Sequence, residues 1–201
     1  MRIALLDYGA GNLTSVRKGF LAAGAELLSP RAPEDLSDCS GVVVPGVGHF
    51  GVTAALEAGW REAVLRRVEA GVPLFGICLG MQWLYEGSEE APEAAGLGLV
   101  SGRCERIVAE RPLKVPHVGW NRLDAVRPSV LLEEIADHAQ VYFTHTFAAP
   151  ITPDCVASSE HGQAFAAVVE RGHVAGVQFH PEKSGDAGIR LLRNFIALTR
   201  K

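Results

Sequence analysis

Short apolar runs, each closely followed by glycine or proline, alternate with helical patterns through the first 86 residues. The apolar runs span residues 2–7, 26–28, 41–44 and 72–77. Helical patterns lie between them at residues 13–21 and 56–68, and the second is interrupted near Gly59. Apolar strands separated by amphipathic helices are typical of a parallel sheet that is covered on both faces. This alternation predicts an α/β fold.

The second half of the chain carries shorter segments of strand character. We expect strands near residues 97–108, 115–119, 140–144, 154–160, 164–171 and 173–179, with a hairpin at 170–173. A last amphipathic helix is expected from about residue 185 to 200. Because no repeat or linker divides the sequence, we expect one domain over residues 1–201, with a central mixed, mostly parallel sheet flanked by helices.

Composition excludes several classes of protein. The 201 residues are 48% apolar and 21% charged, as in soluble globular domains, and their net charge of −4 disfavours nucleic-acid binding. No apolar run approaches the roughly 20 residues of a membrane helix. The four cysteines form no C-x-x-C pair, which disfavours a zinc site or a disulfide framework and predicts a reducing cytoplasm. The histidines likewise lack the spacing of a metal site.

Cys78 ends the fourth apolar run, with Gly76 before it and Gly80 after it. This is the cysteine counterpart of the G-x-S-x-G turn, which exposes a nucleophile between a strand and a helix. Glycines suit such a sharp turn because neighbouring side chains would collide there. The start of a helix would favour the thiolate and offer N–H groups to an oxyanion. The alternative is that Cys78 is a buried structural cysteine, and this is our interpretation of Cys39, Cys104 and Cys155.

A candidate base follows the apolar run at residues 174–179. His180 and Glu182 are separated by Pro181, which imposes an extended turn. Residues two apart in an extended backbone point the same way, so the Glu182 carboxylate can orient the His180 imidazole. A surface turn is the alternative. Three further histidines stand beside turns and could line a pocket: His49, His117 and His145.

The segment Pro45–Gly48 follows the third apolar run. In a parallel sheet, loops at the carboxyl ends of the strands share one edge, so this loop can lie beside Cys78. Its two glycines would allow backbone N–H groups to face an oxyanion. An ordinary turn is the alternative, while a phosphate-binding loop is disfavoured because no Lys-Ser/Thr pair follows.

Together these motifs resemble those of the triad-type (class I) glutamine amidotransferases. A narrower resemblance is to the glutaminase subunits of imidazole glycerol phosphate synthase (HisH). It is carried by four segments: residues 7–13, 45–48, 116–121 and 180–184. The two resemblances together extend over nearly the whole chain.

The resemblance implies a role for each matching residue. It implies a catalytic triad of Cys78, His180 and Glu182. It implies oxyanion donors on the backbone of Val47, Gly48 and Leu79. It implies a glutamine site at Gly46, Gln82, Glu90, Thr144, His145 and Thr146. It implies a partner surface at Trp120, Tyr142 and Lys183. Phe147 departs from the family pattern, which often has tyrosine at this position.

The implied reaction is hydrolysis of L-glutamine to glutamate and ammonia through a thioester, without a metal or cofactor. In this family the ammonia passes to a cyclase subunit with a (β/α)8 barrel. That subunit makes imidazole glycerol phosphate and an aminoimidazole carboxamide ribotide in histidine biosynthesis. Free ammonia would be lost to water, and the glutaminase unit occupies the chain, so we expect a heterodimer. We also expect the partner to stimulate a slow glutaminase through Pro45–Gly48.

Three other functions remain open from the sequence. One is the glutaminase subunit of a different synthase, for pyridoxal phosphate or purine synthesis. Another is a cysteine peptidase or chaperone-like relative with the same broad fold. The third is an interaction protein with a vestigial site, which the intact Cys78, His180 and Glu182 disfavour.

Overall fold

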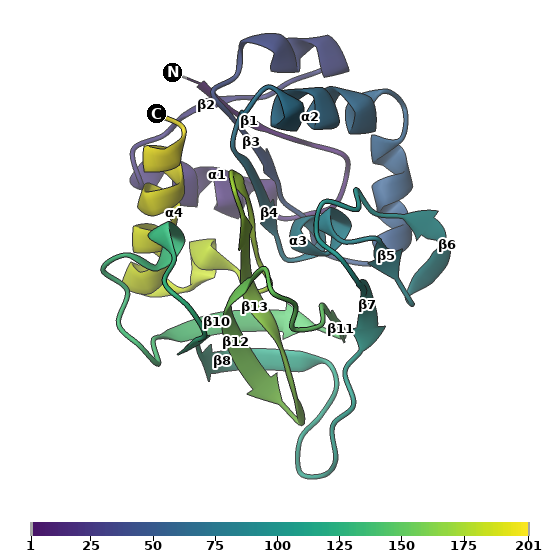
Figure 1. The fold of residues 1–201 in the computed structure, drawn as a ribbon, viewed down its shortest axis with the longest axis vertical. Helices are drawn as coiled ribbons and strands as arrows, with labels where there is room; N and C mark the ends of the chain where they lie inside the picture. Colours follow the sequence, from purple (N-terminus) through teal and green to yellow (C-terminus); the bar gives the residue numbers. More distant parts are fainter. Residues whose placement is uncertain (1, 201) are drawn as a thin grey trace.

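An eight-stranded mixed sheet forms the centre of the computed structural model, which describes residues 2–200 (Figure 1). Its strands are β1 (Arg2–Leu5), β2 (Glu26–Leu28), β3 (Gly41–Val44), β4 (Leu74–Ile77), β9 (Asp124–Ala125), β12 (Cys155–His161), β13 (Gln163–Arg171) and β14 (Val174–Val177). They are ordered β2-β1-β3-β4-β14-β13-β12-β9. Neighbours from β2 to β14 are parallel, and the remaining pairs are antiparallel. The predicted mixed sheet is therefore confirmed.

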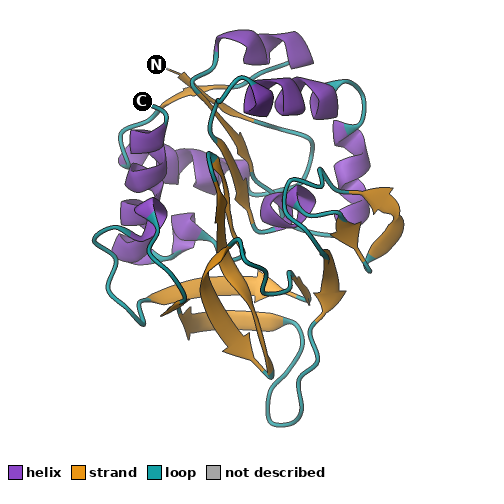
Figure 2. Ribbon diagram, viewed as in Figure 1, coloured by secondary structure: helices purple, strands orange, loops and turns teal. Residues whose placement is uncertain are grey.

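Two small sheets lie beside the central one (Figure 2). One pairs β8 (His117–Arg122) with β10 (Gln140–His145), and the other joins β11 (Phe147–Ala148), β7 (Arg103–Arg106), β5 (Gly87–Ser88) and β6 (Ala91–Ala95). The prediction of a strand over residues 97–108 is wrong except at residues 103–106, which form β7. Gly98 and Gly102 have φ angles of 67° and 101°, which break the extended backbone there.

The helices are α1 (Leu13–Ala22), α2 (Trp60–Glu69), α3 (Leu79–Leu84) and α4 (Gly185–Leu198). Short 3-10 helices span Pro33–Asp38, Phe50–Leu56, Val130–Leu132 and Pro181–Lys183. The predicted interruption near Gly59 is confirmed, because this residue caps α2 with a φ angle of 82° that few other residues adopt. Within residues 2–200, no helix has the length and apolar character needed to cross a membrane.

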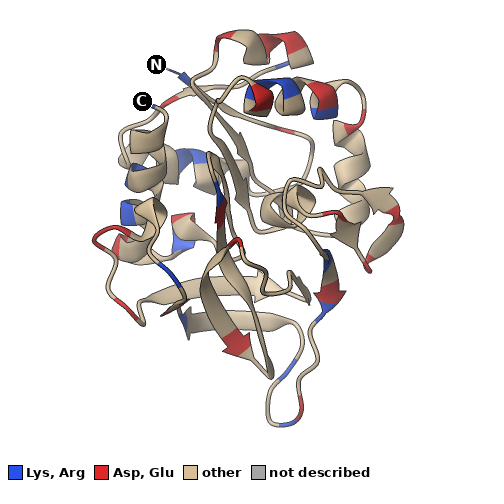
Figure 3. Cartoon of the chain, viewed as in Figure 1, with Lys and Arg blue, Asp and Glu red and all other residues tan. Residues whose placement is uncertain are grey.

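Side chains of the central strands alternate between two hydrophobic clusters. Ile3 and Leu5 of β1 join Phe20 of α1 and Phe195 of α4 on one face of the sheet. Ala4 of the same strand joins the cluster that contains residues of α2 and α3 on the other face. Figure 3 shows charged residues along α2 and none on β3 or β4. The sheet is thus covered on both faces, as the apolar runs predict.

Candidate active site

Cys78 occupies the sharp turn between β4 and α3. Its φ and ψ angles of 53° and −107° lie outside the regions that residues with a Cβ normally adopt. A Cβ on Gly76 would lie 2.5 Å from the Gly80 carbonyl oxygen, and one on Gly80 would lie 1.7 Å from the Val44 oxygen. The two glycines therefore allow the turn to pack against β3.

Strand order brings the three sequence motifs to one edge of the sheet. β4 lies between β3 and β14, and all three run parallel. The residues that follow these strands therefore meet at their carboxyl ends. The backbone N–H of Cys78 donates to the Val177 carbonyl of β14 at 2.7 Å. This contact fixes the nucleophile turn against the strand that leads to His180.

His180 and Glu182 form a buried pair near Cys78. The Nδ1 atom of His180 lies 2.9 Å from Oε1 of Glu182, and both side chains are at most 2% exposed. Burial by itself lowers the pKa of His180, but Cys78 and Glu182 together raise it to about 10. The Nε2 atom makes no well-directed hydrogen bond within residues 2–200, but the hydrogen-bonding approach of Cys78 is the largest of the influences that raise this pKa. The imidazole is therefore charged at neutral pH.

The Pro45–Gly48 loop contacts the nucleophile turn directly. The N–H of Leu79 donates to the Gly46 carbonyl at 3.3 Å, and the N–H of Val47 donates to the Ala10 carbonyl at 2.9 Å. Two of the expected oxyanion donors are thus engaged within the protein. Tyr8 holds the base of the loop, because its hydroxyl donates to the Pro45 carbonyl at 2.7 Å.

A cavity of about 290 Å³ opens beside Cys78. It is lined by Gly48, Cys78, Leu79, Gln82, Glu90, Pro116, Thr144, His145, Thr146 and Phe147. All the residues that the resemblance assigns to glutamine therefore lie at one cavity, with the exception of Gly46. That residue packs against Tyr8 and Leu79, where a Cβ would approach the Tyr8 hydroxyl and the Leu79 Cβ to 2.3 and 2.9 Å.

Two polar residues on the cavity wall are fixed by the protein. Gln82 uses both hydrogens of its amide, one toward the Phe147 carbonyl at 2.9 Å and one toward Oε1 of Gln178 at 3.1 Å. Its oxygen is left to accept a hydrogen bond from a ligand. The Oε2 atom of Glu90 accepts the Phe50 N–H at 2.7 Å, which holds this carboxyl group at the cavity wall.

His145 belongs to a chain of hydrogen bonds that leads away from the cavity. Its Nδ1 lies 2.9 Å from the Phe147 carbonyl, which can only accept, so Nδ1 carries the hydrogen. Its Nε2 then accepts from Nδ1 of His117 at 3.0 Å, and Nε2 of His117 accepts from the Asn121 amide at 3.3 Å. Burial lowers the pKa of His145 to about 3 and that of His117 to about 4, so both rings are neutral.

The residues predicted for a partner surface gather on the outer face of β8 and β10. Trp120 is 57% exposed and stands edge-on to Tyr142, with ring centroids 6.1 Å apart. The ammonium group of Lys183 lies 5.5 Å from the Tyr142 ring centroid. The neighbouring Val118 is also 57% exposed, so the patch combines apolar and cationic groups.

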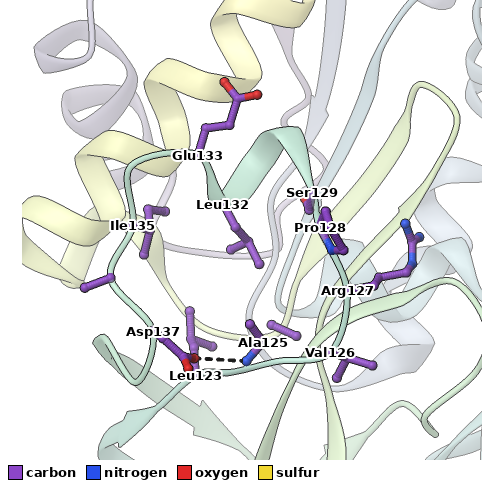
Figure 4. Close-up of a pocket in the computed structure, with 12 residues that line it drawn as sticks. Leu123, Ala125, Val126, Arg127, Pro128, Ser129, Leu132, Glu133, Ile135 and Asp137 are labelled. Carbon is purple, nitrogen blue, oxygen red and sulfur yellow. Dashed lines mark hydrogen bonds between the residues drawn. The ribbon is translucent and has the colours of Figure 1, made fainter.

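A larger pocket of about 440 Å³ lies away from Cys78, beside β9 and the 3-10 helix Val130–Leu132 (Figure 4). Leu132 and Ile135 project into it, and Asp137 caps the Ala125 N–H. Its lining includes neither a cysteine nor a histidine. This pocket is larger than the cavity beside Cys78 but lacks its reactive groups. Within residues 2–200, no cluster of three metal-ligating side chains occurs.

Two contacts at the site were not predicted from the sequence. Gln178 is fully buried, and its amide nitrogen lies 3.6 Å from the Cys78 sulfur. A single amide in the apolar run 174–179, two residues before His180, was the available signal. Tyr8 had no comparable signal, because its contact with Pro45 depends on the adjacency of β1 and β3.

Comparisons with known proteins agree with this geometry. A model of the family "Glutamine amidotransferase class-I" matches residues 4–198. The imidazole glycerol phosphate synthase subunit HisH of Gloeobacter violaceus is 45% identical over 96% of this chain and 88% of its own length. The HisH subunit of Methanothermobacter thermautotrophicus is 43% identical over 98% and 99%.

Solved structures show the same fold. A chain described as a glutamine amidotransferase has a TM-score of 0.77 at 24% identity and covers 99% of both chains. PurLQS from Thermotoga maritima has a TM-score of 0.74 at 17% identity, over 98% of this chain and 97% of the solved one. The chain therefore belongs to the class I glutamine amidotransferases and, within them, to the HisH subunits of imidazole glycerol phosphate synthase.

Proposed function

We propose that Cys78, His180 and Glu182 hydrolyse L-glutamine and that the ammonia passes to a cyclase subunit with a (β/α)8 barrel. One observation carries the proposal. The buried Glu182–His180 pair interacts with Cys78, and the cavity that Cys78 lines also contains Gln82, Glu90 and residues 144–146, which are expected to bind glutamine. The HisH names of the relatives support the identity of the partner.

In the first step, the Cys78 thiolate attacks the carboxamide carbon of glutamine. A carbon–sulfur bond forms, and an electron pair of the carbonyl moves to its oxygen. The His180 imidazolium gives its Nε2 proton to the amide nitrogen, the carbon–nitrogen bond breaks and ammonia leaves. Glu182 holds the ring in position through Nδ1 and stabilises its positive charge. The product of this step is a thioester on Cys78.

In the second step, water attacks the thioester while neutral His180 takes one of its protons. The carbon–sulfur bond breaks, glutamate leaves, and the thiolate–imidazolium pair is restored. Glu90 and the Gln82 oxygen suit the ammonium group of glutamine, because both are acceptors on the cavity wall. Thr144, Thr146 and the backbone of His145 would hold its carboxylate, because both ring nitrogens of His145 are already engaged.

We also propose that the partner controls the glutaminase through Pro45–Gly48. The N–H groups of Val47 and Leu79 are bound to the carbonyls of Ala10 and Gly46, so they cannot stabilise an oxyanion as they stand. Rotation of this loop would release a donor. Docking of the cyclase against Trp120, Tyr142 and Lys183 would bias that rotation, because the HisH family works as a two-subunit enzyme.

The same proposal includes the bounds of the glutaminase domain and the cellular compartment in which the enzyme works. Residues 1–201 are taken as one glutaminase domain, and a reducing cytoplasm suits a chain whose four cysteines are all free. Neither a metal nor a cofactor enters the steps above.

A glutaminase assay with and without the cyclase subunit and its nucleotide ligand tests the proposal. We expect slow formation of glutamate by the chain alone and a large increase in the presence of the liganded cyclase. The Cys78→Ala variant should form no glutamate while still binding the cyclase. Stimulation by a different synthase subunit would show that the partner is not the cyclase. A high rate that does not depend on any partner would refute the control by docking.

A further inference from the structure

Two buried glutamine side chains connect the Phe147 carbonyl with the sulfur of Cys78. Gln82 Nε2 donates to the carbonyl at 2.9 Å and to Oε1 of Gln178 at 3.1 Å, and Gln178 Nε2 donates to the sulfur at 3.6 Å. Gln82 is 4% exposed and Gln178 is fully buried. The three contacts form one continuous hydrogen-bonded path.

The Phe147 carbonyl at one end of this path determines which group donates in each hydrogen bond. A backbone carbonyl can only accept, so the nitrogen of Gln82 must face Phe147. Gln82 then has a second hydrogen for its neighbour, so the oxygen of Gln178 must face Gln82. The nitrogen of Gln178 is left to face Cys78. The nucleophile therefore receives an N–H donor, and the opposite orientation of Gln178 would place two donors in contact.

The neutral thiol and the thiolate of Cys78 can form different hydrogen bonds with the groups around the sulfur. A neutral thiol can donate to the Thr144 carbonyl, 3.9 Å away. A thiolate cannot donate, but it accepts from Gln178 and faces the charged ring of His180. A donor that is already in place favours the charged acceptor, because hydrogen bonds to ions are the stronger ones. Gln178 and His180 both interact with Cys78 and lie two residues apart, just beyond the end of β14.

We propose that Gln178 is a further residue of the catalytic machinery: its amide N–H fixes the Cys78 sulfur and favours the thiolate, while Gln82 fixes the orientation of that amide. The inference rests on the proposed function, in which the thiolate of Cys78 attacks glutamine. In this proposal Gln82 has two roles: its side-chain oxygen faces the substrate, and its side-chain nitrogen orients Gln178.

The pH dependence of Cys78 alkylation by iodoacetamide tests the proposal in the full-length chain without glutamine. Peptide mass spectrometry identifies the modified cysteine, and thermal unfolding reports whether each variant is folded. We expect Gln178→Leu to raise the pH of half-maximal alkylation by about one unit, which lowers the rate on the acidic limb about tenfold. Gln178→Glu should raise it further, because a carboxylate would face the thiolate.

The matched controls are Gln140→Leu and Gln140→Glu, at an exposed glutamine of β10. These controls should keep the midpoint of the unsubstituted chain. If Gln178→Leu does not fold, Gln178→Met, which has a similar length and no N–H donor, decides the question. An unchanged midpoint in the folded Gln178 variants would overturn the inference, and a lower melting temperature with that unchanged midpoint would mark a purely structural role.

A separate measurement distinguishes failure of this inference from failure of the proposed function. If Cys78→Ala abolishes glutamate formation but the Gln178 variants keep the alkylation midpoint, only the role of Gln178 is wrong. If Cys78→Ala still turns over glutamine, the proposed function fails, and the alkylation series still reports the hydrogen bond to sulfur.

Discussion

The backbone N–H of Leu79 donates to the carbonyl of Gly46, with 3.3 Å between nitrogen and oxygen. Leu79 follows the nucleophile, and Gly46 belongs to the loop that should complete the oxyanion site. Their hydrogen bond therefore occupies a donor that catalysis would need. In this arrangement the proposed nucleophile and base lie together, while the proposed oxyanion donors are engaged in other hydrogen bonds.

Substitution of Gly46 by alanine should disturb this loop. The new Cβ would approach the Tyr8 hydroxyl to 2.3 Å and the Leu79 Cβ to 2.9 Å. We expect a loss of about 1–3 kcal/mol in the free energy of unfolding, measured in urea, and a strong loss of partner-stimulated glutaminase activity. Tyr8→Phe removes one of the two close contacts, so the double variant should lose less than the sum of the two single losses. Strict additivity would show that the Tyr8 contact is not the cause.

Cys78 itself should be a strained position. Because its φ angle is 53°, glycine fits the turn better than alanine does. We expect Cys78→Gly to be about 1 kcal/mol more stable than Cys78→Ala in chemical denaturation, although both should form no glutamate. Equal stabilities would contradict the strain, and glutamate formation by either variant would contradict the assignment of the nucleophile.

The His180–Glu182 pair should stabilise the fold over a defined pH range. The pKa of His180 is raised from 6.5 to about 10, so its stabilising effect is complete below pH 6.5 and is lost as the pH rises toward 10. We expect Glu182→Gln to lower the free energy of unfolding by about 3 kcal/mol at pH 6 and by far less near pH 10. Glu93→Gln, at an exposed glutamate, serves as the control. A difference that does not vary with pH would argue against a charged His180.

The neutral His117–His145 pair should have the opposite pH dependence. Their pKa values are lowered to about 4 and about 3, so the unfolded chain binds more protons and stability falls as the pH drops below 6.5. We expect His117→Gln to reduce the slope of unfolding free energy between pH 4 and 6 by up to about 1.4 kcal/mol per pH unit. The exposed His138, changed to glutamine, gives the comparison. An unchanged slope in His117→Gln would show that this ring is not buried in its neutral form.

Trp120 should anchor the cyclase subunit. It is a large aromatic side chain with more than half of its surface exposed, beside Tyr142 and Lys183. Truncation to alanine should weaken binding by about 2 kcal/mol, or roughly 30-fold in Kd, as measured by titration calorimetry. Val126→Ala, at an exposed apolar residue of the larger pocket, should leave Kd unchanged. If both substitutions weakened binding equally, the cyclase interface would not be centred on Trp120 of β8.

The sequence predicted the features that depend on local pattern. The strands at 26–28 and 41–44 were placed at their observed bounds, since each apolar run ends at a turn signal. The two-residue strands β5, β9 and β11 could not be predicted, because two residues carry no periodicity. Gln178 was missed for a different reason: its partner is 100 residues away, and only the pairing of β14 with β4 brings the two together.

The insertion of β14 between β4 and β13 has a consequence for the nascent chain. Cys78 leaves the ribosome long before the strand that brings it His180, and parallel pairing over such a separation forms late. Until β14 is in place, the Cys78 thiol lacks both the proposed base, His180, and the amide of Gln178. If Cys78 and His180 act as proposed, a partly made subunit would therefore not consume glutamine.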